Sequence, residues 1–565
     1  MMKRHQLDIT VSLVSPFLFP ILDAAPFGID RAALRDRQKR PIIPADQVRG
    51  VLRHAAEQVN AEVKLWSPDL VIRLFGKPDD EGKFALNRSQ IVFGDLVAER
   101  VPQASALAYR VKIDDETGAA EAGHLLAVEL VAPHGQEVTF SGSATLFAPD
   151  HEKDKIVNLL DVAAGRVSAI GAMKSAGFGE VFEKVEGQEV TSSFRVRPQG
   201  QGTPLLSATP RNPIADRVHL VIGIDRPFLI DPEIPAPNVY LGATVIPGGA
   251  IKGALARKFE LAGQARPDLQ AALTALSISH ASPVCWPDRT LPLSVVANDN
   301  GVADALGHQA VLIGDQPAFF QNDMKPRHLT AARTAAGLSD LPSFAQADRG
   351  HARILPGRGT AAEGQLFFTR AVDPGNCRWQ CVVDYGNVGD AKRGELHSAL
   401  MSGIDGLGAT GARLTFADET ISAPPEAQPR PNQDVDITLE TDAIMAIPED
   451  GDDAHKAYEA YFRHWMGSST ILIDFFAQQG FARGYHGRRF RREDERYRPF
   501  VLTRAGSIFR LRGYDPGALD KALRYGLPAP FVGKKQTTWQ DCPFQPENGY
   551  GRIRADWQGV GGLQA

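Results

Sequence analysis

The chain has 565 residues, too many for one hydrophobic core, and at roughly 150 residues per domain this length predicts three or four folded units. Hydrophobic residues make up 43% and charged residues 23%, as in ordinary globular proteins, and no apolar run reaches the roughly 20 residues of a membrane-spanning helix. The net charge of −5 argues against a protein that is basic all over, but a local basic groove is compatible with it.

Four cysteines, Cys285, Cys377, Cys381 and Cys542, are too few and too scattered for a disulfide framework. Cys377 and Cys381 are close in sequence, but no second ligand pair follows at the spacing of a zinc site. The basic and apolar start of the chain is interrupted by polar residues and predicts a first strand rather than a signal peptide. We therefore expect a cytoplasmic, reduced protein with no membrane partner.

The first elements alternate between strand and helix patterns. Residues 7–19 alternate apolar side chains as a half-buried strand does, and residues 40–55 place Ile-Pro at the start of a helix. Residues 113–142 predict two strands around a turn with glycine, and residues 159–181 predict a helix, a strand-like stretch and a glycine-rich loop. Strand–helix–strand–strand–helix–strand is the order of the ferredoxin-like, or RRM-like, fold.

The same blocks recur in the same order further along the chain, at 218–259, 355–384 and 396–416. The sequence therefore predicts an α+β protein of tandem ferredoxin-like domains with insertions. The expected division is a first domain at 1–195, a Pro- and Gly-rich linker at 196–216, a second domain at 217–421 with an insertion around 265–345, and a third, degenerate domain at 434–565.

Glycine-rich loops occur at equivalent places in the three units, at 168–181, 403–414 and 547–557. Glycine lets the backbone approach a phosphate closely, and exposed amides cradle its oxygens; a tight turn is the alternative reading. A basic residue, Lys174, Arg413 or Arg552, accompanies each loop. A further segment, 482–498, mixes arginines with aromatic residues as single-stranded nucleic-acid binders do, although acidic residues interrupt it.

The stretch IPGGAIKGALA (246–256), together with a C-terminal G-x-G loop, resembles the RAMP superfamily of CRISPR systems. The first domain resembles the repeated backbone subunit of type III effectors through FGIDRAALRDRQKRPIIPADQVRGVLR (27–53) and IGAMKSAGFGEV (170–181). It departs from that family after Ile-Pro, where Arg49 replaces a lysine. The later domains resemble the large subunit that caps the crRNA 5′ end in type III-D complexes, through IPGGAIKGALA, GSIFRL (506–511) and NGYGRI (548–553).

This resemblance implies a subunit that binds crRNA and the guide–target duplex beside other RAMP backbone subunits and a large polymerase-like signalling subunit. It also implies that Asp30 cleaves the target RNA, assisted by a divalent cation such as Mg²⁺ and by no organic cofactor. Asp36 and Asp231 are runners-up for the catalytic carboxylate, and His351 is the candidate if the chain instead processes precursor crRNA. A non-catalytic RNA-binding scaffold is the remaining alternative.

The candidate RNA-binding residues are basic side chains near the predicted loops and helices, and glycines of the loops. They are Arg31, Arg35, Arg37, Lys39, Arg40, Arg49, Arg53, Gly171, Lys174, Gly177, Gly179, Lys252, Arg257, Arg358, Arg413, Arg488, Arg489, Gly549, Gly551 and Arg552.

Overall fold

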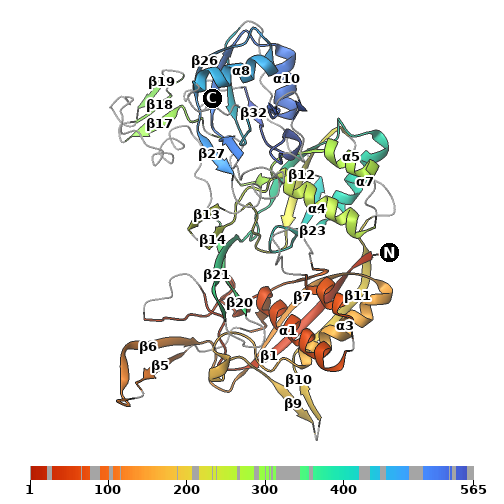
Figure 1. Cartoon of the computed structure of the whole chain (residues 1–565), viewed down its shortest axis with the longest axis vertical. Helices are drawn as coiled ribbons and strands as arrows, with labels where there is room; N and C mark the ends of the chain where they lie inside the picture. The colour runs from red at the N-terminus through yellow and green to blue at the C-terminus, as the bar shows by residue number, and fades with distance from the viewer. Residues whose placement is uncertain are drawn as a thin grey trace.

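The computed structural model describes most of the chain and arranges it as three α+β units that follow one another along the long axis of the molecule (Figure 1). The described residues are 2–21, 28–64, 66–76, 89–100, 106–114, 116–186, 189–206, 215–231, 233–236, 238–263, 267–285, 290, 292–298, 301–304, 306, 309–312, 344–354, 361–418, 433–445, 453–482, 500–532, 535–536 and 542–555. The predicted fold class is confirmed.

Unit one is built on a mixed-length sheet with strand order β11-β1-β7-β4-β2, which is the ferredoxin-like order 4-1-3-2 completed by a short extra strand. Short strands β3 and β8 pair with β7 and β1. The bounds are β1 (Met2–Val14), β2 (Ile42–Ile43), α1 (Ala45–Val63), α2 (Pro68–Phe75), β3 (Ile91–Phe93), β4 (Leu96–Ala98), β7 (Glu137–Pro149), α3 (Asp150–Gly165), β8 (Glu180–Val181) and β11 (Arg195–Pro204).

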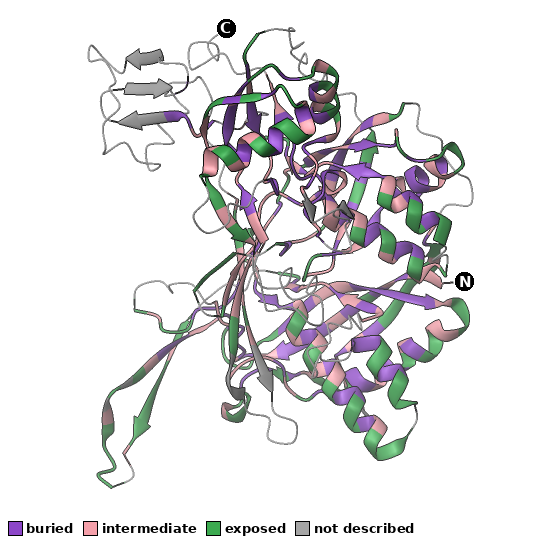
Figure 2. Cartoon of the chain, turned by 45° about the horizontal axis from the view of Figure 1, so that its top comes forward, coloured by how far each residue is buried: buried purple, intermediate pink, exposed green. Residues whose placement is uncertain are grey.

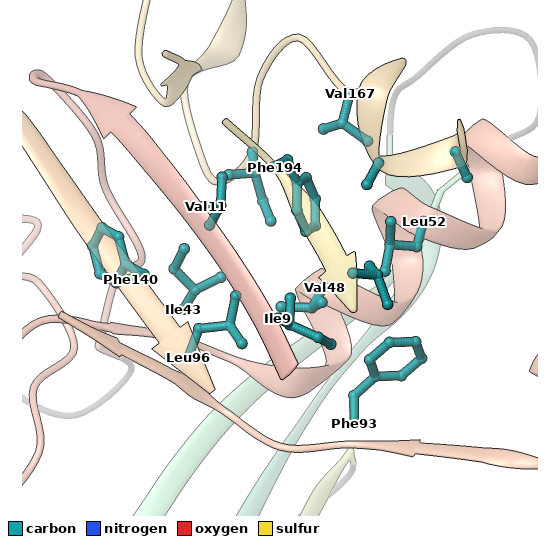
Figure 3. Packing of buried hydrophobic residues seen from close by; sticks show 14 of the residues in the cluster. Ile9, Val11, Ile43, Val48, Leu52, Phe93, Leu96, Phe140, Val167 and Phe194 are labelled. Carbon is teal, nitrogen blue, oxygen red and sulfur yellow. The ribbon is translucent and has the colours of Figure 1, made fainter. Parts of the chain in front are cut away.

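The core of unit one lies between this sheet and its helices (Figure 3). Alternate residues of β1, such as Ile9 and Val11, pack with Val48 and Leu52 of α1, and all four are fully buried. Each such side chain contributes about 1.5–3 kcal/mol through the loss of apolar surface from water. The helix α1 begins directly after Pro44, whose φ of −61° suits a helix start.

The prediction that 196–216 is a linker is wrong for its first part. Residues up to Pro204 belong to β11, which pairs antiparallel with β1 from Thr10↔Arg195 to Lys3↔Pro204. Val196 is buried in the core while the later residues are mostly exposed, so an edge strand with an exposed face accounts for the Gly- and Pro-rich composition.

Units two and three repeat the same order of core strands, β15-β22-β12-β24 and β26-β29-β25-β32. Each is 2-3-1-4, which is the 4-1-3-2 order of unit one counted from the opposite edge of the sheet. Each has its own buried cluster. The bounds in unit two are β12 (Arg217–Ile224), α4 (Gly248–Leu261), α5 (Pro267–Ala275), β15 (Ser277–Ile278), β16 (Ser282–Pro283), β22 (Trp379–Asp384), α7 (Asp390–Met401), β23 (Ile404–Leu407) and β24 (Ala412–Asp418). Those in unit three are β25 (Val435–Leu439), α8 (Ala454–Met466), β26 (Ile471–Phe476), β29 (Ile508–Arg512), α10 (Pro516–Tyr525) and β32 (Ile553–Arg554).

Every unit carries a pair of antiparallel strands inserted between its second and third core strands. These are β5 (Ala106–Ile113) with β6 (Ala120–Leu130), β20 (Gln346–Ile354) with β21 (Ala361–Val372), and β27 (Gln479–Ala482) with β28 (Phe500–Thr503). The β5–β6 hairpin projects away from unit one, whereas β20–β21 runs from unit two toward unit one (Figure 1). The hairpin of unit two also pairs with β14 (Val239–Leu241), which pairs with β13 (Glu233–Ala236).

The remaining described elements are small. They are η1 (Lys174–Ala176), β9 (Glu183–Glu186), β10 (Glu189–Ser192), β17 (Val295–Asn298), β18 (Gly301–Asp304), β19 (Gln309–Leu312), β30 (Phe531–Val532), β31 (Lys535–Gln536) and η3 (Pro546–Asn548). Within the described residues, none of the helices has the length and apolar character needed to cross a membrane.

Candidate nucleic-acid interface

The loop 28–40 of unit one, which carries Asp30, is held against the base of the β5–β6 hairpin. The Asp30 backbone N–H donates to the Ala127 carbonyl at 2.9 Å, and Asp30 Oδ2 accepts from the Ala127 N–H at 2.7 Å. The residue is nevertheless exposed. A carboxylate offers about four acceptor positions, so this bond leaves Asp30 with capacity for a further donor or a cation.

Asp36 has a different role in the same loop. Its Oδ1 accepts from the Arg40 N–H at 2.8 Å and its Oδ2 pairs with Arg40 Nε at 2.8 Å. Both oxygens therefore close the turn 36–40, in which Lys39 adopts a left-handed φ of 62°. Asp36 is thus a turn residue, and Asp30 remains the better placed carboxylate.

The other two runners-up lie in unit two. Asp231 has a left-handed φ of 41° and is exposed in the segment between β12 and β13. His351, on β20, reaches unit one: its Nδ1 lies 3.4 Å from Asp46 Oδ2, and its Nε2 lies 2.9 Å from Thr369 Oγ1. The ring stacks on Phe367 at 4.6 Å, and burial lowers its pKa even though Asp46 opposes that shift. Both ring nitrogens are thus already engaged.

Ion pairs neutralise three of the five basic candidates in loop 28–40. Arg35 pairs with Glu129 at 2.6 Å, Arg37 pairs with Asp373 of unit two at 2.9 Å, and Arg40 pairs with Asp36. Arg31 and Lys39 are exposed and have no acidic partner in the described part of the chain. These two are the loop cations that remain available to a phosphate.

The glycine-rich loop of unit one packs beside loop 28–40. Gly171 has a φ of 109°, and a side chain there would meet the Leu18 carbonyl at 2.8 Å; Gly179 is equally constrained by the Ile170 carbonyl. Gly177 has a φ of 80° with open space around its Cα, and Lys174 in η1 is exposed. Gly171 lies against Leu18 and Phe19, and the Phe19 carbonyl accepts from the Leu34 N–H of loop 28–40 at 2.7 Å. The segment at Leu18 and Phe19 therefore joins the two loops.

The structure adds one cation that the sequence did not single out. The Arg110 guanidinium on β5 lies 5.9 Å from the ring centre of Phe178, so the hairpin, the glycine-rich loop and loop 28–40 meet on unit one. We call Arg31, Lys39, Arg110 and Lys174 the unit-one basic surface. No local pattern singled out Arg110, because its contact with Phe178 spans 68 residues of sequence.

One face of the β5–β6 hairpin is apolar and exposed, and the hairpin is coloured largely as exposed in Figure 2. Tyr109 is 63% exposed and Leu125 60% exposed, and Leu107, Val111 and Ile113 share the exposure. Residues 107, 109, 111 and 113 lie on one side of the strand because its side chains alternate, and Val111 pairs with Leu125. An exposed apolar face of this kind is unusual, because the protein buries apolar side chains in the cores of its units.

The remaining basic candidates of α1 and unit two serve the fold. The Arg49 guanidinium donates to the Phe75 carbonyl and burial lowers its pKa, and Arg53 pairs with Glu57 at 2.8 Å. Arg257 pairs with Glu260 at 2.8 Å, and Arg413 pairs with Asp405 at 2.6 Å. Arg358, Arg488 and Arg489 lie outside the described residues.

The C-terminal glycine-rich loop was predicted to contact RNA, but it packs against unit two. Gly549 has a φ of 91°, and a side chain there would meet the His280 N at 2.6 Å; a side chain on Gly248 would meet the Asn548 carbonyl at 2.9 Å. Gly551 has a φ of 68°, and a side chain there would meet the Leu527 carbonyl at 2.6 Å. Lys252 Nζ donates to the Glu547 carbonyl at 3.4 Å, and burial lowers its pKa to about 8.

The prediction that Arg552 binds RNA is corrected in the same way. Its side chain is 8% exposed, donates to the Arg524 carbonyl at 2.6 Å, and has its pKa lowered by burial to about 10. The sequence could not distinguish this packing from phosphate binding, because both require glycine and a nearby cation.

Comparison with known proteins finds a family model that is similar to one of these units. Residues 11–182, which include most of unit one, match the model of the RAMP superfamily. None of the curated proteins gives a match. The chain is similar to a chain of the cryo-EM structure of the type III-B Cmr-beta bound to cognate target RNA, at 16% identity and a TM-score of 0.24, over 34% of this chain and 62% of that one. It is also similar to a chain of the apo state of type III-B Cmr-beta, at 10% identity and a TM-score of 0.24, over 34% of this chain and 97% of that one. Unit one is therefore the part of the chain that is similar to the RAMP superfamily.

Proposed function

We propose that this chain is a subunit of a type III CRISPR RNA-guided complex, in which unit one lies along the guide–target duplex and cleaves the target RNA at one position. The observation that carries the proposal is the exposed Asp30 beside the unit-one basic surface, within the stretch that matches the RAMP superfamily. Sequence specificity then comes from base pairing, while the protein contacts backbone and shape, a division of labour known from another effector class.

The chemistry follows from the position of Asp30. RNA is cut when its 2′-oxygen attacks the adjacent phosphorus in line, the 2′-proton passes to a base, and the 5′-oxygen leaves with a proton. Asp30 supplies a carboxylate that accepts the 2′-proton, or that shares a cation with the scissile phosphate. Arg31 follows it in sequence and Lys39 lies in the same loop, and both supply positive charge for the charge that develops on the phosphate oxygens.

A magnesium ion is compatible with this arrangement. The described residues contain no group of three or more histidine, cysteine, aspartate or glutamate side chains that could hold a metal by themselves. Mg²⁺ in phosphoryl-transfer sites uses one or two carboxylates and completes its shell with phosphates and water, so Asp30 alone suits an ion that arrives with RNA. Such an ion would neutralise charge on the phosphate.

The β5–β6 hairpin supports contact with a duplex. Side chains such as Tyr109 and Val111 are exposed on a ribbon that projects from unit one. Apolar wedges of this kind insert between base steps, and the energy spent on unstacking is recovered through added contact. The Arg110 side of the ribbon lies near the glycine-rich loop and faces the backbone-binding elements.

The proposal for units two and three is that they bind the 5′ handle of crRNA, and it rests on their resemblance to the capping subunit of type III-D complexes. The glycine-rich loop of unit three packs against unit two, so handle contacts of unit three are expected on its other surfaces.

A non-catalytic scaffold is the second candidate. The hydrogen bond from the Ala127 N–H to Asp30 Oδ2 favours it, because it gives Asp30 a structural role. Processing of precursor crRNA by His351 is the third, and the engagement of both ring nitrogens by Asp46 and Thr369 weakens it.

Reconstitution of the complex with crRNA, complementary RNA and Mg²⁺ tests these functions together. Retention of crRNA by the chain with one cut in the target supports the proposal. Retention without a cut supports the scaffold, and failure to retain any RNA contradicts both.

A further inference from the structure

Two cysteines from distant parts of unit two meet at its surface. The Sγ atoms of Cys285 and Cys377 lie 3.2 Å apart, although the residues are 92 positions apart in sequence. Both are free thiols: Cys285 is exposed and Cys377 is partly exposed. The other two cysteines, Cys381 and Cys542, are buried.

The register of the sheet explains why they meet. β16 pairs antiparallel with β22, with Ser282 opposite Gln380 and Pro283 opposite Trp379. The Val284 N–H donates to the Arg378 carbonyl at 2.8 Å, so the same register continues and sets Cys285 opposite Cys377.

The position is also the right kind for a cross-strand bond. Positions in an antiparallel pair alternate between hydrogen-bonded and non-hydrogen-bonded, and side chains approach more closely at the latter. Pro283, which has no N–H to donate, ends the paired part of β16, and Cys285 lies two residues beyond it with its Sγ atom 3.2 Å from that of Cys377. A disulfide there needs little movement of the backbone.

We propose that Cys285 and Cys377 form an oxidisable dithiol, which a small disulfide such as oxidised glutathione converts to an intramolecular disulfide. The exposed Cys285 attacks one sulfur of the oxidant and releases one glutathione thiol. Cys377 then attacks the Cys285 sulfur, breaks the mixed disulfide and releases the second glutathione thiol. Two protein thiols are oxidised, the oxidant is reduced to two thiols, and the two thiol protons pass to them.

The bond would tie together two features of the fold. Cys285 lies just after β16, inside the predicted insertion around 265–345. Cys377 ends the turn in which Asp373 pairs with Arg37 of unit one, and in which a side chain on Gly375 would collide with the Arg37 guanidinium. Oxidation therefore fixes the turn that supports the junction of units one and two.

Thiol counting tests the proposal on the full chain. The native protein is incubated with oxidised glutathione, quenched, denatured and labelled with a maleimide; the chain has four cysteines, so the label should fall from four to two. Dithiothreitol should restore four. Cys285→Ser and Cys377→Ser should each keep three labelled thiols once any bound glutathione is accounted for by intact mass.

Cys381→Ser is the matched control, and its label should fall from three to one. The proposal is overturned if the wild-type chain keeps four thiols, if its mass shows stable glutathione adducts in place of the loss of two hydrogens, or if Cys285→Ser still loses two thiols. Peptide mapping without reductant identifies the joined pair, and any pair other than Cys285–Cys377 also overturns it.

Discussion

Arg349 of unit two donates to Asp95 of unit one, with 2.7 Å between Nη2 and Oδ2. The other carboxylate oxygen of Asp95 accepts from the Ala45 N–H at 2.8 Å, at the first turn of α1. One carboxylate thus holds both the start of a helix and the hairpin of the neighbouring unit. Both side chains are largely buried, at 16% and 26% exposure, which makes the pair stronger than a solvated one.

Arg349→Ala should therefore destabilise the junction between units one and two. We expect a loss of about 1–3 kcal/mol in the free energy of unfolding, since Asp95 loses a charged hydrogen-bond donor. Chemical denaturation measures it, and a double-mutant cycle with Asp95→Ala isolates the pair. Arg53→Ala, which breaks an exposed pair with Glu57, is the control and should cost under about 0.5 kcal/mol. Equal effects of the two substitutions would contradict the role given to Arg349.

The junction between units two and three should be sensitive to Gly549→Ala. The added side chain meets the His280 backbone and must adopt a left-handed φ, so a loss of about 2–4 kcal/mol is expected. Gly253→Ala in α4 is the matched control, because open space surrounds it and alanine favours a helix. Thermal unfolding compares the variants, and a Gly549→Ala chain as stable as Gly253→Ala would refute the packing account.

Lys258 should make the stability of unit two depend on pH. Its Nζ is buried and donates to the Ala399 and Gly403 carbonyls at 2.8 and 2.6 Å, and burial lowers its pKa to about 8. The unfolded chain keeps this proton up to about pH 10, so the unfolded state binds more protons between these values. The free energy of unfolding should consequently rise with pH from about 8 to about 10, on the order of 1–3 kcal/mol relative to Lys258→Met. Parallel pH profiles of the wild type and Lys258→Met would contradict this.

The unit-one basic surface should govern how RNA binding depends on salt. Each of Lys174→Ala and Arg31→Ala should weaken binding of crRNA and reduce the slope of log K against log salt by about 1. Arg40→Ala is the control, since its charge is already paired with Asp36. Salt titrations of binding by the reconstituted complex measure these slopes, and unchanged slopes for both variants would remove these cations from the interface.

Local patterns in the sequence were enough to predict the fold class and elements such as β1, α1 and α4. Alternating residues such as Ile9 and Val11 identified β1, and Ile-Pro at 43–44 and 246–247 marked the starts of α1 and α4. These features depend on neighbours along the chain, so they are visible without a structure.

Contacts between distant segments could not be predicted in this way. Arg37 and Arg349 are indistinguishable in sequence from phosphate-binding arginines, yet each pairs with an aspartate of another unit. Arg552 and Gly549 fit a phosphate loop equally well, and only their contacts with the Arg524 carbonyl and with His280 assign them to packing. The meeting of Cys285 with Cys377 depends on strand register, which the spacing of cysteines does not reveal.

Target cleavage by the reconstituted complex tests the central claim most directly. Wild type, Asp30→Ala and Asp36→Asn are each given labelled complementary RNA with Mg²⁺, after equal binding of crRNA and target has been verified. Asp30→Ala should lose one cut by at least about 100-fold, as expected for removal of a general base, while Asp36→Asn keeps it. Cleavage at an unchanged rate by Asp30→Ala with normal RNA binding would contradict the assignment of Asp30 as the catalytic residue.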